Sequence, residues 1–190
     1  MMRWLLWLIG GVLLGGIVHL GTVLALPRMA AHDAYARLAS RSPVNAAIAL
    51  PPTSPEDAPL PFMDPAFAAA ICRYDLAGGP LKLTVPVSPS YTSVSFYTRY
   101  GVSYYAINDR AAGRRVIELD LMTPAQRAAL PEDEDVTAAD RLIVESPTPT
   151  GVIVMRALAS EAGLATAARN ALSRAQCAPA TTPVLSPSRR

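Results

Sequence analysis

An uncharged run opens the chain and is its longest apolar pattern. From Trp4 to Leu26 there are 23 residues without Asp, Glu, Lys or Arg. A helix over this run would extend roughly 35 Å at about 1.5 Å per residue, enough for a hydrocarbon core of about 30 Å. A cleaved signal peptide usually has a shorter apolar region, of about 7–15 residues. We therefore expect an uncleaved transmembrane anchor over 1–27, with the signal peptide and a buried soluble helix as the alternatives.

The pattern changes after Pro27. Residues 28–42 have helical composition and predict a short juxtamembrane helix. Six of the fifteen residues in 51–65 are proline, which is typical of an extended spacer or a segment lying along the surface of a domain. We expect a Pro-rich linker over 43–65, an exported globular domain over 66–177 and a disordered tail over 178–190.

The residue pattern of the globular region predicts mainly strands. Residues 91–98 alternate clearly, with Thr92, Val94, Phe96 and Thr98 on one face. Other predicted strands cover 70–76, 81–85, 103–108, 114–121, 141–145 and 152–156. The apolar triads of the last two indicate central buried strands, and the loop 109–113 predicts a hairpin between 103–108 and 114–121.

Two helices complete the prediction. Thr123 and Pro124 form a good helix start, with threonine as the cap and proline in the first turn, so a short helix is expected over 125–130. The alanine-rich stretch 157–176 predicts a closing helix. The fold class that follows is α+β, mostly antiparallel, preceded by one transmembrane helix.

Charge and cysteines bear on compartment and partners. The net charge is +2, and no long basic run is interleaved with aromatic residues, so we expect no nucleic-acid partner. Cys72 and Cys177 are the only cysteines; they are either a disulfide closing a loop of about 100 residues or two unrelated buried thiols. Charges flanking the anchor do not decide its orientation. We favour the disulfide, and hence a domain on the periplasmic side of a bacterial inner membrane.

The membrane run carries a distinctive face. At 100° per residue, Gly11, Gly15, His19 and Thr22 fall within about 80° of one another. A Gly-x-x-x-Gly pair lets two helix backbones approach closely, and a polar residue within a span usually faces protein or water. The two interpretations are a helix–helix interface, and a glycine-rich anchor that tolerates a neutral histidine.

Catalytic chemistry has little support. His19 and His32 are the only histidines, and both precede the globular region. A Ser–His–acid triad or a histidine metal site within 66–177 is therefore excluded, and we predict no catalytic residue, metal or cofactor. Glu118 and Asp120 share a predicted strand face, where an acid–base pair is less favoured than a solvated sheet surface. The acidic run 132–135 lacks the ligand spacing of a calcium loop and is read as solvated.

Two further features suggest binding. Asn108, Asp109 and Arg110 form a polar loop tip, explained either by turn chemistry or by recognition. Tyr91 and Tyr97 share a predicted face, which is either a binding surface or ordinary sheet packing.

Several stretches together resemble a known family: HLGTVLALP at 19–27, AICRYDL at 70–76 followed by Gly79-Pro80, YYAINDR at 104–110 and DRLIVESP at 140–147. They are similar to the membrane-anchored bacterial branch of the domain of unknown function family numbered twelve fifty-four. The resemblance brings no catalytic residues with it. Longer relatives carry a second, sister domain of unknown function, so the resemblance implies that a separate membrane protein supplies that domain here.

These observations favour a non-catalytic subunit or accessory of an envelope membrane complex. One alternative is an envelope hydrolase that uses carboxylates such as Asp75, Glu118 or Asp120. Another is a small-molecule or lipid-binding module, which would need an apolar cavity.

Overall fold

The computed structural model describes residues 2–29, 34–52, 63–113, 115–130 and 142–180. It divides the chain into two compact units, Met1–Asp33 and Ala34–Arg190, which are considered separately.

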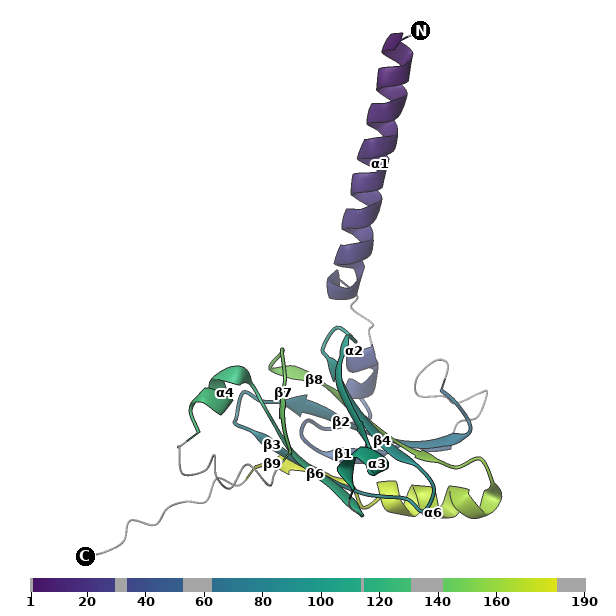
Figure 1. The fold of residues 1–190 in the computed structure, drawn as a ribbon, viewed down its shortest axis with the longest axis vertical. Coiled ribbons are helices and arrows are strands. Elements are labelled where there is room, and N and C mark those ends of the chain that lie inside the picture. Colours follow the sequence, from purple (N-terminus) through teal and green to yellow (C-terminus); the bar gives the residue numbers. More distant parts are fainter. Residues whose placement is uncertain (1, 30–33, 53–62, 114, 131–141, 181–190) are drawn as a thin grey trace, which may run out of the picture. The chain divides into compact units, whose positions relative to one another are not determined.

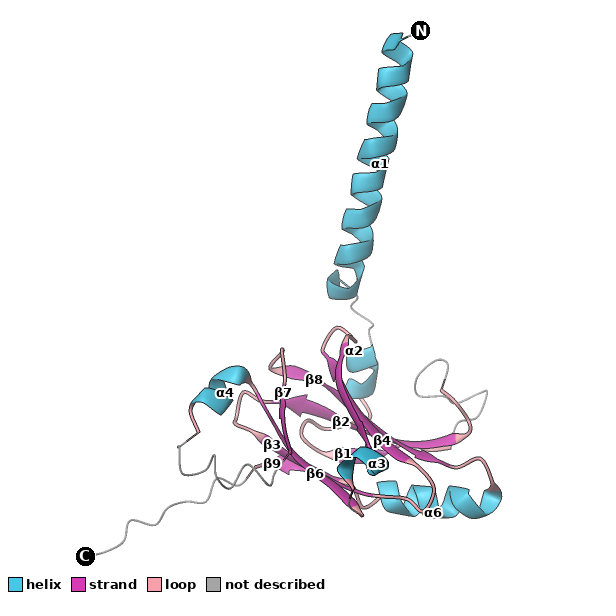
Figure 2. Cartoon of the chain, in the orientation of Figure 1, coloured by secondary structure: helices cyan, strands magenta, loops and turns pink. Residues whose placement is uncertain are grey.

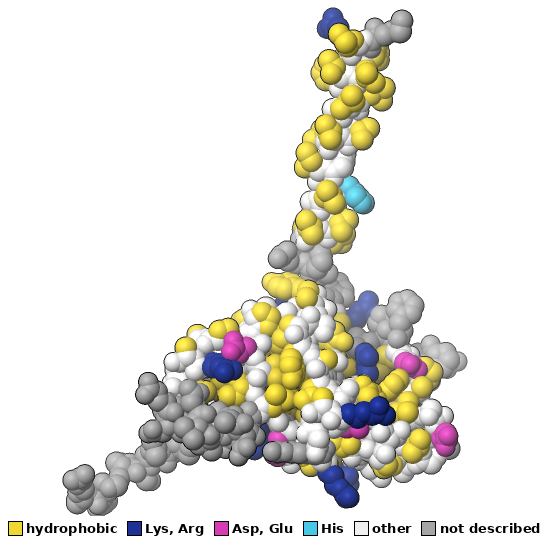
Figure 3. Space-filling model, in the orientation of Figure 1, with side chains coloured by type: hydrophobic (Ala, Val, Ile, Leu, Met, Phe, Trp, Pro, Cys, Tyr) yellow, Lys and Arg dark blue, Asp and Glu magenta, His cyan; other side chains and the backbone are white. Residues whose placement is uncertain are grey.

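The first unit is the helix α1 (Met2–Met29). Its stretch Met2–Leu26 is long and apolar enough to cross a membrane, and no residue of the apolar window is buried. Hydrophobic side chains cover its visible surface (Figure 3). The exposure argues against the helix of a soluble core, and it is compatible with a membrane anchor or a signal sequence. Pro27 does not end the helix, which continues to Met29.

The second unit is built on two sheets (Figures 1 and 2). The five-stranded sheet has the order β1 (Ala47–Ala49), β2 (Phe67–Asp75), β8 (Thr150–Leu158), β4 (Thr92–Thr98) and β5 (Ser103–Asn108). The four-stranded sheet has the order β7 (Leu142–Glu145), β6 (Val116–Met122), β3 (Leu81–Pro86) and β9 (Gln176–Pro179). Every neighbouring pair is antiparallel except β6 and β7. The described helices of this unit are α2 (Ala34–Ala39), α3 (Asp109–Ala112), α4 (Pro124–Ala128) and α6 (Ala162–Leu172).

The main core combines residues of both sheets. Phe96 and Ile153 come from the five-stranded sheet, Leu83 and Leu119 come from the four-stranded sheet, and all four are buried. α6 adds Leu172 and packs against β2, β8 and β3. Strand β4 buries every second residue, as its alternation predicted. The predicted α+β class is therefore confirmed.

A disulfide joins the two sheets. Cys72 in β2 and Cys177 in β9 are bonded, with their Cα atoms 6.4 Å apart. Both side chains lie in the core. The pairing predicted from the sequence is confirmed, and it suggests that the domain matures in an oxidising compartment.

The predicted hairpin between 103–108 and 114–121 is wrong. β5 belongs to the five-stranded sheet and β6 to the four-stranded sheet. The short helix α3 makes the crossing; Asn108 caps its first turn, and Gly113 ends it with a left-handed φ of 62°. Both strands direct an apolar face to the shared core, so the chain between them has to change sheets.

Strand β7 also differs from its prediction. We expected a central buried strand over 141–145, but among the described strands β7 lies at the edge of its sheet and pairs with β6 alone. Of its four residues only Val144 is buried. The corresponding prediction for 152–156 is correct, since β8 lies between β2 and β4.

The predicted closing helix over 157–176 is too long. β8 continues to Leu158, and Ala157 is paired with Ala68 on one side and Thr92 on the other. Only Ala162–Leu172 is helical, and β9 begins at Gln176. The sheet ladders and the disulfide outweigh the helix propensity of alanine at both ends.

The segment that precedes residue 66 takes part in the fold. The expected linker 43–65 contains β1, which pairs with β2. Leu38 of α2 and Leu50, which follows β1, pack with Ile71 and Val152 on the outer face of the five-stranded sheet. β2 and β8 carry apolar residues on both faces, so this outer layer removes apolar surface from water. Of the juxtamembrane helix expected over 28–42, residues 34–39 form α2. Residues 53–62 of the expected linker and 181–190 of the expected tail lie outside the described residues.

Candidate functional site

A cluster of hydroxyl groups brings together side chains from β2, from β5 and from Ser146, which follows β7. The Tyr74 hydroxyl is 2.9 Å from Ser146 Oγ and 3.1 Å from the Tyr104 hydroxyl. Ser146 Oγ donates to the carbonyl of Thr148 at 2.7 Å. The Tyr74 hydroxyl also donates to the carbonyl of Tyr97 at 3.3 Å, and in its contacts with Ser146 and Tyr104 either oxygen can be the donor. Each of the three hydroxyls therefore has hydrogen-bond partners, as buried hydroxyls require.

Tyr104 reaches the cluster because of a β-bulge. Phe96 pairs with Tyr105, and Tyr97 pairs with Ser103, which leaves Tyr104 as the extra residue. Both neighbouring tyrosines therefore contact the Phe96 ring, with centroids 6.1 Å and 5.8 Å away. Sequence reasoning missed this contact, because strict alternation would place the two tyrosines on opposite faces.

Gly151 makes room for the same cluster. A Cβ at this position would overlap the Tyr74 hydroxyl, its ring carbon Cζ and the carbonyl oxygen of Tyr97. Gly151 is paired with Tyr74 across the sheet. The glycine is therefore required by the close approach of the tyrosine ring to the backbone.

Burial raises the pKa of the Tyr104 hydroxyl above its ordinary value near 10, because desolvation penalises the phenolate. Above about pH 10 the unfolded chain releases this proton while the folded chain keeps it. The folded state then binds more protons, so the free energy of unfolding falls as the pH rises, by at most about 1.4 kcal/mol per pH unit for this group.

Tyr104→Phe should remove that contribution. We expect the difference in the free energy of unfolding between wild type and variant to be constant from about pH 7 to 9 and to shrink above about pH 10. Urea unfolding at a series of pH values measures it. A difference that stays constant at high pH would contradict the argument.

Two of the three residues in the predicted recognition loop make hydrogen bonds within the domain. Asn108 Oδ1 accepts a hydrogen bond from the backbone N–H of Ala111 at 2.9 Å, and Asp109 Oδ1 accepts one from Thr92 at 3.3 Å. Arg110 is exposed. Helix capping therefore accounts for Asn108, and Asp109 ties α3 to the start of β4.

The tyrosines that share a predicted face have different surroundings. Tyr91 packs edge-on against Phe67, with ring centroids 6.5 Å apart. Tyr97 lies opposite Val152 in the outer layer of residues on the five-stranded sheet and is half-buried. Packing accounts for Tyr91.

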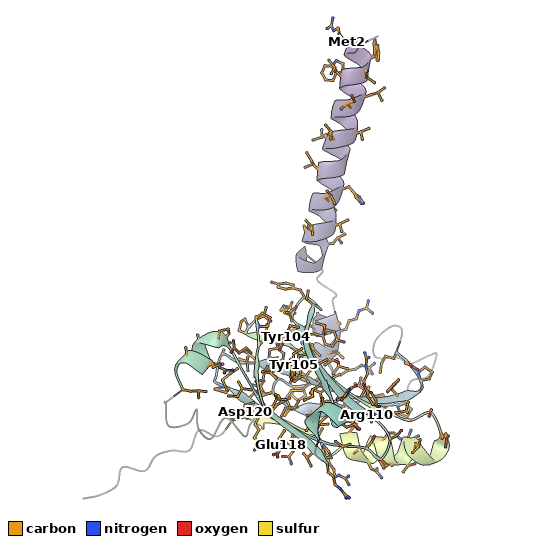
Figure 4. The ribbon with its side chains drawn as sticks, viewed as in Figure 1. Met2, Tyr104, Tyr105, Arg110, Glu118 and Asp120 are labelled. Atoms are coloured by element: carbon orange, nitrogen blue, oxygen red, sulfur yellow. A yellow bond between two sulfur atoms is a disulfide. The ribbon has the colours of Figure 1, made fainter. Side chains whose placement is uncertain are left out.

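The candidate carboxylates are not brought together. Glu118 and Asp120 lie on one face of β6 in the four-stranded sheet, opposite Thr84 and Lys82 (Figure 4). Asp75 ends β2 in the other sheet, where its Oδ1 accepts from the N–H of Ala77 at 2.9 Å. Among the described residues, no group of three or more His, Cys, Asp or Glu side chains could hold a metal ion. The acidic run 132–135 lies outside the residues that the structure describes.

A small cavity of about 90 Å³ opens beside α6. Its lining is mainly apolar, including Leu50, Met63 and Phe67, and Arg169 supplies a cation. Pockets for drug-sized ligands are typically about 300–1,000 Å³. The cavity suits only a few atoms of a ligand.

The four residues of the predicted helix face all lie on α1. A methyl group added at Gly11 or Gly15 would meet nothing within 4 Å. The Thr22 hydroxyl donates to the carbonyl of Val18 at 2.8 Å, so its hydrogen bond is made within the helix. His19 is exposed.

Comparisons with known proteins place the domain in a family. No curated protein matches the chain. Its structure is similar to a crystal structure of the VPA0106 protein from Vibrio parahaemolyticus, with a TM-score of 0.57 and 14% identity over 77% of this chain and 34% of that one. A protein from Burkholderia cenocepacia described as uncharacterised matches with a TM-score of 0.43 and 18% identity, over 63% of this chain and 32% of that one. The chain thus spans about a third of the length of these solved proteins. The family model described as "Protein of unknown function (DUF1254)" matches residues 44–179, and this chain belongs to that family.

Proposed function

We propose that this chain is a single-pass subunit or accessory of a bacterial envelope complex, in the membrane-anchored branch of its family. In this proposal α1 anchors it in the inner membrane, and the disulfide-bonded domain lies in the periplasm without a catalytic role. The observation that carries the proposal is the face of Gly11, Gly15, His19 and Thr22 on an exposed apolar helix.

Helix association in a membrane supports this reading. Lipid tails are as apolar as leucine, so helices associate mainly through close packing and hydrogen bonds. Two glycines one turn apart remove the side chains that would hold a neighbouring helix away. A histidine on the same face can then donate to, or accept from, the neighbour.

The proposed partner is a second membrane protein that presents a complementary helix. The family resemblance suggests that it carries the sister domain of unknown function. The disulfide supports the periplasmic side, because disulfides persist in oxidising compartments and are rare in the cytosol.

Purification in mild detergent from native membranes tests the proposal. Wild-type chain should co-purify with a second membrane protein in stoichiometric amount, identified by mass spectrometry. Gly11→Leu/Gly15→Leu should reduce that yield at least about tenfold, because two leucines separate the helix backbones and loss of about 1.4 kcal/mol is already tenfold.

Gly10→Leu/Gly16→Leu is the matched control. These glycines lie on other sides of α1, and a Cβ at either position also meets nothing within 4 Å. The control should keep the partner. A wild-type chain that purifies alone, or equal loss in both double variants, would overturn the proposed interface.

A further inference from the structure

The cavity beside α6 has apolar walls that come from several parts of the second unit. The start of β2 supplies Phe67 and Ala68, the segment after β1 supplies Leu50, and α6 supplies Ala165. Met63 adds an unbranched side chain that can adapt to a ligand. Among the described residues that line the cavity there is no Asp, Glu, Lys or His. A ligand therefore has to be apolar where it touches these walls.

Backbone N–H groups around the cavity are already used by the fold. The N–H of Leu50 donates to the carbonyl of Ala69 at 2.8 Å, and the N–H of Ala165 donates to the carbonyl of Glu161 at 2.9 Å. The lining residues 51, 52 and 65 are prolines, which have no N–H to donate. The walls therefore offer a polar ligand few hydrogen-bond donors.

Arg169 supplies the donors that the walls lack. It follows Ala165 by one helical turn, so both side chains lie on the same face of α6. The Arg169 side chain is exposed, and no ion pair or side-chain hydrogen bond holds its guanidinium in the described part of the chain. Asp64, which stands between two lining residues in the sequence, accepts a hydrogen bond from the N–H of Ala66 at 2.9 Å. The charge at the cavity is therefore positive.

The volume of the cavity limits the length of a ligand. An apolar cavity of about 150 Å³ accommodates benzene, which has six carbons. On the same scale, a cavity of about 90 Å³ takes roughly three or four carbons. A polar head on such a chain would lie at the mouth of the cavity.

We propose that this cavity binds short-chain monocarboxylates of about the size of butyrate. The hydrocarbon part lies between β2 and α6, and the carboxylate accepts hydrogen bonds from Arg169. A carboxylate suits this position because it only accepts hydrogen bonds, whereas a guanidinium only donates them, and the planar forks of the two groups match. The inference concerns the second unit alone and goes beyond the proposed complex.

Titration of the full chain in detergent micelles with linear carboxylates tests the size of the site. With methyl-13C methionine, the Met63 signal reports on the cavity, and the signal of Met122, which is buried and does not line the cavity, is the internal reference. The dissociation constant should fall about fourfold for each carbon added from acetate to butyrate, as the burial of one methylene predicts. It should stop falling by hexanoate. A constant that keeps falling through octanoate, or a Met63 signal that does not shift with any carboxylate, would overturn the site.

A comparison of butyrate with 1-butanol tests the role of Arg169. The wild type should bind butyrate about three- to fivefold more tightly than 1-butanol, and Arg169→Gln should bind the two equally. Arg174→Gln is the matched control, because Arg174 is an exposed arginine that follows α6 and does not line the cavity. It should keep the preference. Equal binding of both compounds by the wild type, or the same loss in the control, would contradict recognition of the carboxylate.

Filling the cavity tests where the ligand lies. Ala165→Leu adds three carbons to the lining and keeps a residue that favours helices, so the Met63 signal should no longer respond to butyrate. Thr166→Leu changes the neighbouring exposed position, which does not line the cavity, and should bind butyrate like the wild type. An unchanged Met122 signal shows that each variant is folded. Butyrate binding that persists in Ala165→Leu would place the ligand elsewhere and overturn the proposal, while the proposed complex would stand.

Discussion

Replacing Cys72 and Cys177 with alanine should lower the free energy of unfolding by about 4–5 kcal/mol. The disulfide joins residues 105 apart in the sequence, and in the chain-entropy model a loop of about this length restricts the unfolded chain by that amount. Domains are typically stable by about 5–15 kcal/mol, so the variant would lose a large part of its stability. Equilibrium urea unfolding followed by circular dichroism measures the loss.

The single variants give a matched control. Cys72→Ala alone should cost nearly as much as the double variant, because the loop is closed only when both sulfurs are present. Two single costs that add up to the double would contradict this explanation. The native, non-reduced protein should also resist thiol alkylation, and modification of both cysteines would show that they are not bonded.

Gly151→Ala should destabilise the domain by about 2–6 kcal/mol. The new methyl group would overlap Tyr74 and the Tyr97 carbonyl, so either the ring or the β4 backbone has to move. Overpacking of this kind costs about 1–3 kcal/mol or more, and a displaced Tyr74 hydroxyl leaves buried partners unsatisfied at a further cost of about 1–3 kcal/mol. Thermal or urea unfolding measures the change.

Gly163→Ala is the comparison, because a Cβ at that exposed position in α6 meets nothing within 4 Å. It should be neutral or stabilising by up to about 1 kcal/mol, since alanine favours the helix. Similar losses in the two variants would mean that the close approach of Tyr74 is not the cause. Tyr74→Leu/Gly151→Ala should cost less than the sum of its two single changes, as expected for residues in contact.

The sequence predicted those parts of the fold that follow from local pattern. The alternation of Thr92, Val94, Phe96 and Thr98 identified β4, and the uninterrupted apolar run after Gly151 identified the central position of β8. Thr123 and Pro124 marked the start of α4, where the predicted cap is present. The pairing of Cys72 with Cys177 could be predicted because the sequence has no other cysteine.

The remaining errors share one cause, which is that pairing between strands far apart in the sequence leaves little local signal. Nothing near Gly113 indicates that β5 and β6 belong to different sheets. β1 is too short to alternate, and it is a strand because β2 offers it an open edge. Ala157 has a helical composition around it, yet two neighbouring strands hold it in a ladder.

The candidate site could be predicted only in part, for the same reason. The Gly11–Thr22 face depends on the geometry of one helix, so it could be read from spacing alone. Tyr104 depends on a bulge that shifts its register against β4, and the cavity beside α6 joins segments that are distant in the sequence. Such contacts become visible only once the sheets are assembled.

The central place of β8 also determines when the domain can fold. β8 lies between β2 and β4, but a ribosome makes it only after β2, β3, β4, β5, β6 and β7. Until it arrives, β2 and β4 each present an unpaired apolar edge, a hazard for aggregation. The larger sheet therefore cannot be completed until β8, which begins at Thr150, has been synthesised.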